Sequence, residues 1–110
     1  IIGWGSTFGE ILEAMIIARD EGIRCAAMKV VLLSPLPMEP INALLSDATE
    51  GLVPELNYEG QFANLLTGTT GRAGTRLNRV PGPPMHVEDI VDEIRRLAAK
   101  RKGRKRIAAE

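Results

Sequence analysis

A carboxylate and two amides follow one short apolar segment of the chain, at Glu55, Asn57 and Gln61. The segment itself, residues 52–56, is typical of a strand, and a helical pattern follows from Gly60. In open parallel sheets, ligands and partner surfaces lie at such strand-to-helix junctions. These three side chains either orient a ligand or a partner, or cap the helix and pin a loop. Glu55 alone does not make a general base, because no second catalytic group stands near it in sequence.

A second junction of the same kind opens the chain. Its first four residues resemble a strand, and Gly5, Ser6 and Thr7 begin a small-residue turn that leads into a helix. The free amides at a helix start could hold an anion. However, the glycines lack the spacing of a dinucleotide fingerprint, and no acidic residue stands about 20 residues further on to bind a ribose. We therefore favour a structural turn and keep a stand-alone nucleotide- or anion-binding module as the alternative.

The elements that position these junctions can be predicted from the apolar pattern. A helix is expected over residues 8–21, with Thr7 and Glu10 forming a capping box and Gly22 ending the helix. Its buried stripe is expected to be Phe8, Ile11, Leu12, Met15 and Ile16. The almost continuous apolar run over residues 23–33 indicates a strand buried on both faces, which the prolines at 35 and 37 end.

Two shorter helices and two strands follow in the predicted order. A helix over residues 38–45 should carry Pro40 in its first turn and turn Ile41, Leu44 and Leu45 toward the core. After the strand at 52–56, a helix over 60–66 should bury Phe62, Leu65 and Leu66. Residues 67–75 are rich in glycine and threonine and indicate a loop. A short edge strand is expected at 77–80, and residues 81–84 form an irregular connector.

The last helix has the clearest pattern in the chain. Its acidic residues crowd the first half and its basic residues the second, which suits the helix dipole. One face is lined by Val87, Ile90, Val91, Ile94 and Leu97. Strands alternate with helices throughout, so we predict an α/β fold, a three-layer α/β/α sandwich around a mainly parallel sheet. The domain is expected to span residues 1–99, and residues 100–110 a basic tail.

Composition sets bounds on function. The 110 residues have no net charge, yet eight of the fourteen Lys and Arg lie between Arg95 and Arg106, and residues 1–94 carry six basic and thirteen acidic side chains. A basic tail could bind nucleic acid or an acidic partner, but we favour a solvated helix end that runs on into a disordered or linker segment, so that nucleic acid is an improbable partner. No apolar run is long enough to span a membrane.

Single residues of chemically active types are interpreted as structural. Cys25 excludes an internal disulfide, and with His86 as the only histidine the chain cannot build a zinc site alone. We expect His86 to cap the last helix or lie on the surface, Cys25 to behave as a small core residue, and Trp4 to be a core or interface residue. A cytoplasmic location fits this composition. The chain begins within an apolar run, without an initiating Met or a signal pattern, and is expected to be a piece of a larger protein.

Three motifs in order resemble one enzyme family. They are the opening Gly3-Trp4-Gly5-Ser6-Thr7, the corner Leu33-Ser34-Pro35-Leu36-Pro37, and Glu55-Leu56-Asn57 followed by Gly60-Gln61. Their order and spacing resemble the alpha chain of the 2-oxoacid:ferredoxin oxidoreductases, especially the 2-oxoglutarate type. Residues 81–84 and the acidic start of the last helix are similar to the end of the same domain. Pro54 departs from the pattern, because the family usually has an aliphatic residue there.

The resemblance implies a domain like the C-terminal domain of transketolase, which follows the pyrimidine-binding domain in the alpha chain. It implies a whole enzyme that uses thiamine diphosphate, magnesium and an iron–sulfur cluster to decarboxylate a 2-oxoacid. Electrons would pass to ferredoxin and the acyl group to coenzyme A, while the cofactors would lie mainly on other domains and the beta chain. This domain would then bind no cofactor alone, and would serve packing and the subunit interface. Gly5, Ser6, Thr7, Glu55, Asn57 and Gln61 are its candidate interface or ligand residues.

Overall fold

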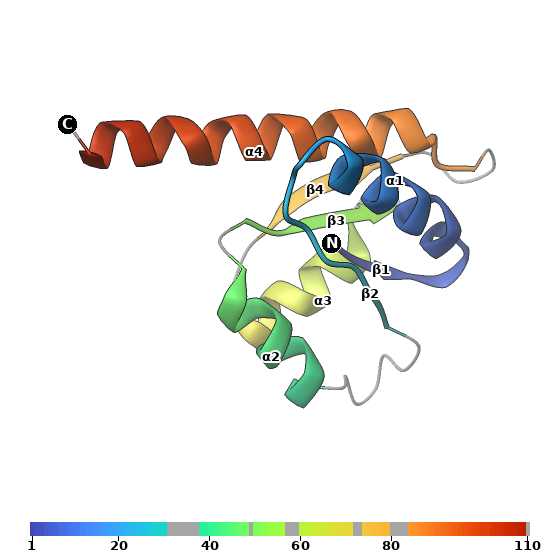
Figure 1. The fold of residues 1–110 in the computed structure, drawn as a ribbon. Helices are drawn as coiled ribbons and strands as arrows, with labels where there is room; N and C mark the ends of the chain where they lie inside the picture. Colours follow the sequence, from blue (N-terminus) through green and yellow to red (C-terminus); the bar gives the residue numbers. More distant parts are fainter. Residues whose placement is uncertain (31–37, 49, 57–59, 72–73, 80–83, 110) are drawn as a thin grey trace.

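Strands and helices alternate along the whole chain, as predicted (Figure 1). The computed structural model describes residues 1–30, 38–48, 50–56, 60–71, 74–79 and 84–109, without the side chains of residues 6, 47 and 103–109. In chain order the elements are β1 (Ile2–Trp4), the 3-10 turn η1 (Gly5–Thr7), α1 (Phe8–Asp20), β2 (Met28–Val30), α2 (Met38–Asp47), β3 (Leu52–Glu55), α3 (Gln61–Thr70), β4 (Thr75–Asn78) and α4 (Val87–Ala109).

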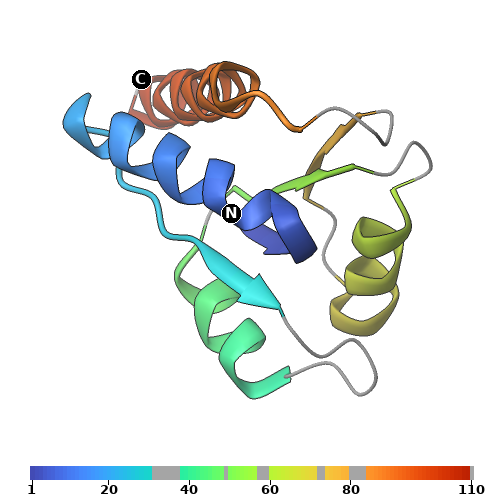
Figure 2. The same ribbon diagram turned by 90° about the vertical axis from the view of Figure 1, so that its right-hand side faces the viewer.

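The strands lie between two layers of helices, which confirms the predicted α/β class. Figures 1 and 2 show α1 and α4 on one side of the strands and α2 and α3 on the other. Each side has its own hydrophobic core. Leu52 and Leu77 contribute to the core with α1 and α4, and Val53 to the core with α2 and α3. Because successive residues of a strand point to opposite faces, β3 supplies both cores.

The strands pair in parallel, but the described residues form two separate two-stranded sheets in place of one continuous sheet. β1 pairs with β2, and β3 pairs with β4. The amides of Thr75 in β4 and of Arg79 just after it donate to the carbonyls of Gly51 and Glu55 at 2.8 and 3.0 Å. Alternate residues of a parallel strand bond to the same neighbour, so the nitrogen of Pro54 points away from β4. β1 lies along that side, and Pro54 has no amide hydrogen to offer it.

The second strand is much shorter than expected. Residues 23–27 are irregular, β2 covers three residues, and residues 31–33 lie outside the described part of the chain. Ile23, Cys25 and Ala27 pack against the core of α1 and α4, whereas Arg24 and Lys29 are exposed. Over residues 23–27 burial alternates with the period of a half-buried extended segment, so the prediction of burial on both faces is wrong there. Met28 and Val30 pack against the other core, that of α2 and α3.

Helix α1 has nearly the predicted bounds but a different buried face. Ile11, Ala14 and Ala18 are fully buried, while Leu12 is 39% and Ile16 57% exposed. The small alanines let α1 pack closely against α4, which turns the larger side chains outward. The capping box is also wrong, since Thr7 has helical backbone angles and makes no side-chain capping bond. Gly22 does end the helix in the left-handed conformation, with φ +82°.

Helix α3 runs to Thr70, so the predicted loop over 67–75 is wrong for its first four residues. The hydroxyls of Thr67, Thr69 and Thr70 donate to the carbonyls four residues earlier, at 2.9, 2.8 and 2.6 Å. This back-bonding satisfies the hydroxyls inside a helix. Gly71 then ends α3 with φ +73°. Leu65, predicted to be buried, is 39% exposed.

The remaining elements agree with the sequence more closely. Ile41 of α2 is fully buried, and Leu44 and Leu45 pack against it from partly buried positions. β4 begins two residues before the expected edge strand, and residue 80 lies outside the described part of the chain. The predicted apolar face of α4 is confirmed. The helical backbone continues to Ala109, so the proposed boundary at residue 99 falls inside one helix. None of the described helices is long and apolar enough to cross a membrane.

The orientation of α1 can be tested by two equivalent truncations. Ile11→Ala should lower the free energy of unfolding by about 2–5 kcal/mol, because it leaves a cavity in the core. Ile16→Ala, on the exposed face, should change it by about 0.5 kcal/mol or less. Urea unfolding followed by circular dichroism measures both values. Equal losses for the two variants would contradict the observed face.

Candidate functional site

Glu55 ends β3 and binds the start of α3. Its side-chain oxygens accept hydrogen bonds from the backbone amides of Phe62 and Ala63, at 2.9 and 3.0 Å. These amides belong to the first turn of α3 and have no partner within the helix. Gly60, the residue before α3, makes no side-chain cap, so Glu55 takes the place of a capping residue from a neighbouring strand. Its negative charge also suits the positive end of the helix dipole.

Both oxygens of Glu55 are therefore engaged, and only 7% of the residue is exposed. A carboxylate held in this way is poorly placed to abstract a proton or to meet a ligand. Of the two interpretations of this residue, the structural one is supported: Glu55 caps a helix. The Glu55 side chain thereby positions α3 against the end of β3.

Asn78 and Gly60 complete this corner; sequence reasoning included Gly60 in a motif but not its close approach to Asn78, and it missed Asn78. Asn78 pairs in register with Glu55 at the end of β4, and its Oδ1 is buried without a hydrogen-bond partner. Gly60 has φ +66°, and a Cβ added there would come within 2.9 Å of Asn78 Nδ2. Both the positive φ and the close approach require glycine. A glycine immediately before a helix was the only sequence signal of this approach.

Of the two predicted amide residues, only Gln61 lies among the residues that the structure describes. Gln61 is the first residue of α3 and its side chain is exposed. Asn57 lies outside the described residues. The convergence of one carboxylate with two amides is consequently not observed, and the roles of Asn57 and Gln61 stay predictions.

The turn after β1 is compact. Gly5, Ser6 and Thr7 form η1, which runs directly into α1. Gly5 has φ +75°, which explains the glycine at this position, and Thr7 is 3% exposed. A buried Thr7 and a turn that continues as helix fit the structural interpretation better than an open anion site.

The single residues of chemically active types are also placed. His86 is exposed, and its carbonyl accepts bonds from the amides of Asp89 and Ile90 at the start of α4. Cys25 is half-buried, and Trp4 is 46% exposed, which favours an interface role over a core role. Within the described ranges, no three His, Cys, Asp or Glu side chains are grouped so that they could hold a metal ion.

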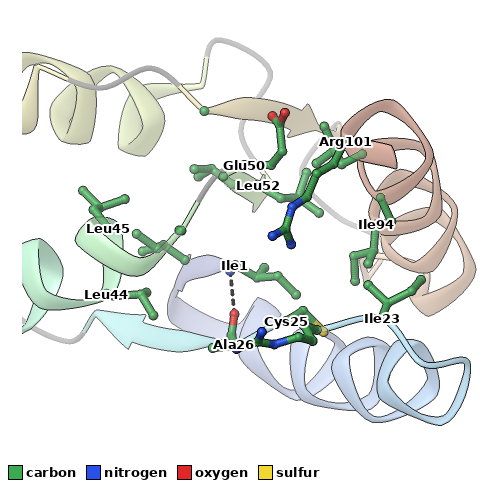
Figure 3. A pocket seen from close by; sticks show the side chains of 18 of the residues that line it. Ile1, Ile23, Cys25, Ala26, Leu44, Leu45, Glu50, Leu52, Ile94 and Arg101 are labelled. Atoms are coloured by element: carbon green, nitrogen blue, oxygen red, sulfur yellow. Dashed lines mark hydrogen bonds between the residues drawn. The ribbon is translucent and has the colours of Figure 1, made fainter. Parts of the chain in front are cut away.

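A cavity of about 920 Å³ lies at the other end of the strands from Glu55. Its wall includes residues that precede β1, β3 and β4, namely Ile1, Gly51 and Gly74. Figure 3 shows Arg101 reaching into it from α4, and the bond from the amino group of Ile1 to the carbonyl of Ala26, 2.7 Å long. No pattern in the sequence indicates this cavity, because its wall comes from many separate segments.

Comparison with known proteins identifies similar chains. No family model matches this chain. It is 31% identical, over 97% of its length, to the alpha subunit of 2-oxoacid:ferredoxin oxidoreductase 1 of Aeropyrum pernix. It is 34% identical, over 87% of its length, to the 2-oxoglutarate oxidoreductase subunit KorA of Mycobacterium tuberculosis.

A solved structure supports the same relationship. The fold matches 2-oxoglutarate:ferredoxin oxidoreductase from Magnetococcus marinus with a TM-score of 0.81 and 32% identity, over 86% of this chain. That structure has 2-oxoglutarate, coenzyme A and succinyl-CoA bound. The chain spans about a sixth of the length of these relatives, namely 17%, 14% and 17%.

The capping role of Glu55 predicts a stability effect. Glu55→Ala should lower the free energy of unfolding by about 1–3 kcal/mol, because two buried amides lose their acceptor. Glu55→Gln should cost less, since its amide oxygen can still accept one bond. Glu13→Ala, a truncation of an exposed glutamate on α1, serves as the control in urea unfolding. A loss at Glu55 no larger than that at Glu13 would contradict the cap.

Proposed function

We propose that this chain, which is homologous to a segment of the alpha subunits of 2-oxoacid:ferredoxin oxidoreductases, serves as a structural and subunit-interface domain of such an enzyme. The observation that carries the proposal is the agreement of sequence and fold with one part of a much longer subunit. The oxidoreductase activity would then belong to the assembled enzyme. Within it, this domain would pack against the other domains and the beta chain.

The chemistry of the whole enzyme follows from the same proposal. It would decarboxylate a 2-oxoacid oxidatively with thiamine diphosphate, magnesium and an iron–sulfur cluster, and pass electrons to ferredoxin and the acyl group to coenzyme A. A relative named for 2-oxoglutarate and a matching structure with 2-oxoglutarate bound favour that substrate. The described residues of this chain offer no metal-binding group, so we assign these cofactors to other parts of the enzyme.

The outer face of α1 supports an interface role. Leu12, Ile16 and Ile17 are 39%, 57% and 36% exposed, and we call these three residues the α1 outer face. Burying a leucine or isoleucine is worth about 1.5–3 kcal/mol, so apolar residues that face water on one side of a helix mark a contact surface. In the proposed enzyme, the remainder of the alpha subunit or the beta chain would cover this face.

The alternative is a stand-alone nucleotide- or anion-binding module at Gly5, Ser6 and Thr7. The burial of Thr7 gives it no support. Calorimetry of this chain with nucleotides and coenzyme A separates the two functions, because tight binding would favour the module.

If the cofactors are bound outside this chain, oxidoreductase activity should require the assembled enzyme. The 110-residue chain alone should not reduce a viologen dye with 2-oxoglutarate and coenzyme A. The complete alpha subunit assembled with its beta chain should do so, because the cofactors would be bound there. Turnover by the isolated chain, or its absence from the assembled enzyme, would refute the proposal.

The interface role predicts a difference between two equally exposed leucines. Leu12→Ser in the complete alpha subunit should weaken its assembly about tenfold, since roughly 1.4 kcal/mol of apolar burial is lost. Leu65→Ser on α3, where the leucine is also 39% exposed, is the matched control. Size-exclusion chromatography over a dilution series measures assembly, and circular dichroism checks the fold. Equal effects of the two changes would argue against the α1 outer face as an interface.

A further inference from the structure

We propose that the cavity at the far end of the strands from Glu55 is the docking site for a peptide segment from the remainder of the alpha subunit. The segment would carry apolar side chains and one acidic residue that pairs with Arg101. This inference rests on the proposed function, since it needs a longer subunit to supply the segment.

The size of the cavity is the first observation. Protein interiors are close-packed and leave few voids larger than a water molecule, whereas this space measures about 920 Å³. It is bounded by the ends of α1, α2 and α3 and by the middle of α4, so both helix layers contribute to one wall. A recess of this volume between two cores can hold side chains of another segment.

The second observation is an unpaired hydrogen-bond donor on a cationic side chain. The Nε of Arg101 is buried and has no hydrogen-bond partner, and Figure 3 shows the side chain reaching from α4 into the cavity. Leaving a buried donor unpaired is unfavourable, and more so for a charged group. A carboxylate from the occupant would form short charge-assisted bonds with the guanidinium group.

The charges of the wall limit the ligand chemistry. Four basic and two acidic side chains line the cavity. Of the two acidic residues, Glu21 already forms an ion pair with Arg95 at 2.9 Å, and Glu50 also has an interaction of its own. The small positive excess suits one carboxylate. Two fixed glutamates disfavour a polyphosphate, which would bring several negative charges against them.

The apolar part of the wall argues for a peptide rather than a small anion. Ile23, Leu44 and Leu45 are only partly buried at the cavity, and Figure 3 shows these side chains around it together with Ile94. A simple anion would pair with Arg101 but leave these apolar side chains exposed to water. An extended segment with apolar side chains on either side of an acidic residue would cover both.

The source of the peptide follows from the size of the relatives. This chain corresponds to 17% of the alpha subunit of Aeropyrum pernix, so in the proposed enzyme most of the subunit lies outside these 110 residues. A segment tethered in the same subunit has an effective concentration in the millimolar range. It can therefore occupy the cavity permanently with contacts that would be weak between separate molecules.

Cys25 lines the cavity and provides a built-in test. In the complete alpha subunit assembled with its beta chain, N-ethylmaleimide should modify Cys25 slowly, because the segment must first open. Peptide-resolved mass spectrometry measures the rate. Arg101→Met in the assembly should raise the rate severalfold. Lys100→Met, at an exposed residue that does not line the cavity, is the control and should leave it unchanged.

A photo-crosslinker identifies the occupant. p-Benzoylphenylalanine in place of Leu45, which lines the cavity, should crosslink to an alpha-subunit segment outside residues 1–110 that contains Asp or Glu. Crosslinks to the beta chain or to a small molecule, or a Cys25 rate that Arg101→Met leaves unchanged in the assembly, would overturn the inference. If this happens in an assembly that decarboxylates 2-oxoglutarate, the proposed function stands and only the docking site fails. An assembly that does not form or has no activity refutes both.

Discussion

The pair of hydrogen bonds from the amides of α3 to the Glu55 carboxylate is the constraint on which this end of the fold depends. A strand ending in a charged residue would ordinarily expose that residue to water. Here the charge is buried because a helix end compensates it, and the helix end is satisfied because a strand supplies the acceptor. The reach of the side chain then fixes how closely α3 follows β3, with glycine required at residue 60.

The second organising feature is a division of the interior by the strands. Leu52 and Val53 are neighbours in sequence but belong to different cores. One core receives α1 and α4, the other α2 and α3. The alternation of a strand thus connects two helix layers that contact each other little. It also explains how a recess can exist where both layers end, because neither core extends far enough to fill it.

Sequence reasoning recovered the order of the elements, the parallel pairing and the apolar faces of α2 and α4, since each has a strong and local pattern. It failed for α1, where large residues such as Leu12 and Ile16 fit the expected stripe as well as the small Ala14 and Ala18 that are in fact buried. Which residues of α1 are buried depends on its packing against α4, and that packing joins residues far apart in the sequence. The threonines of α3 were assigned to a loop because their bonds to preceding carbonyls are not visible in composition.

The candidate site was predictable in part for the same reason. Glu55 could be singled out as a polar group at a strand end, but its role depended on amides seven and eight residues later. Asn78 and Arg101 carried no sequence signal at all. Asn78 matters because it lies opposite Glu55 in the register of β3 and β4. Arg101 matters because the fold brings it together with distant segments around the cavity.

The proline within β3 has a mechanical consequence. No ladder joins β1 to β3 among the described residues, so side-chain packing holds the two strand pairs together. Packed side chains resist compression well but resist sliding poorly. Small relative shifts of the two strand pairs therefore break no ladder hydrogen bond, and they are limited by side chains of both pairs that share one core, such as Ile2 and Val53. A domain of this construction can adjust its outline to its neighbours while each half keeps its own internal register.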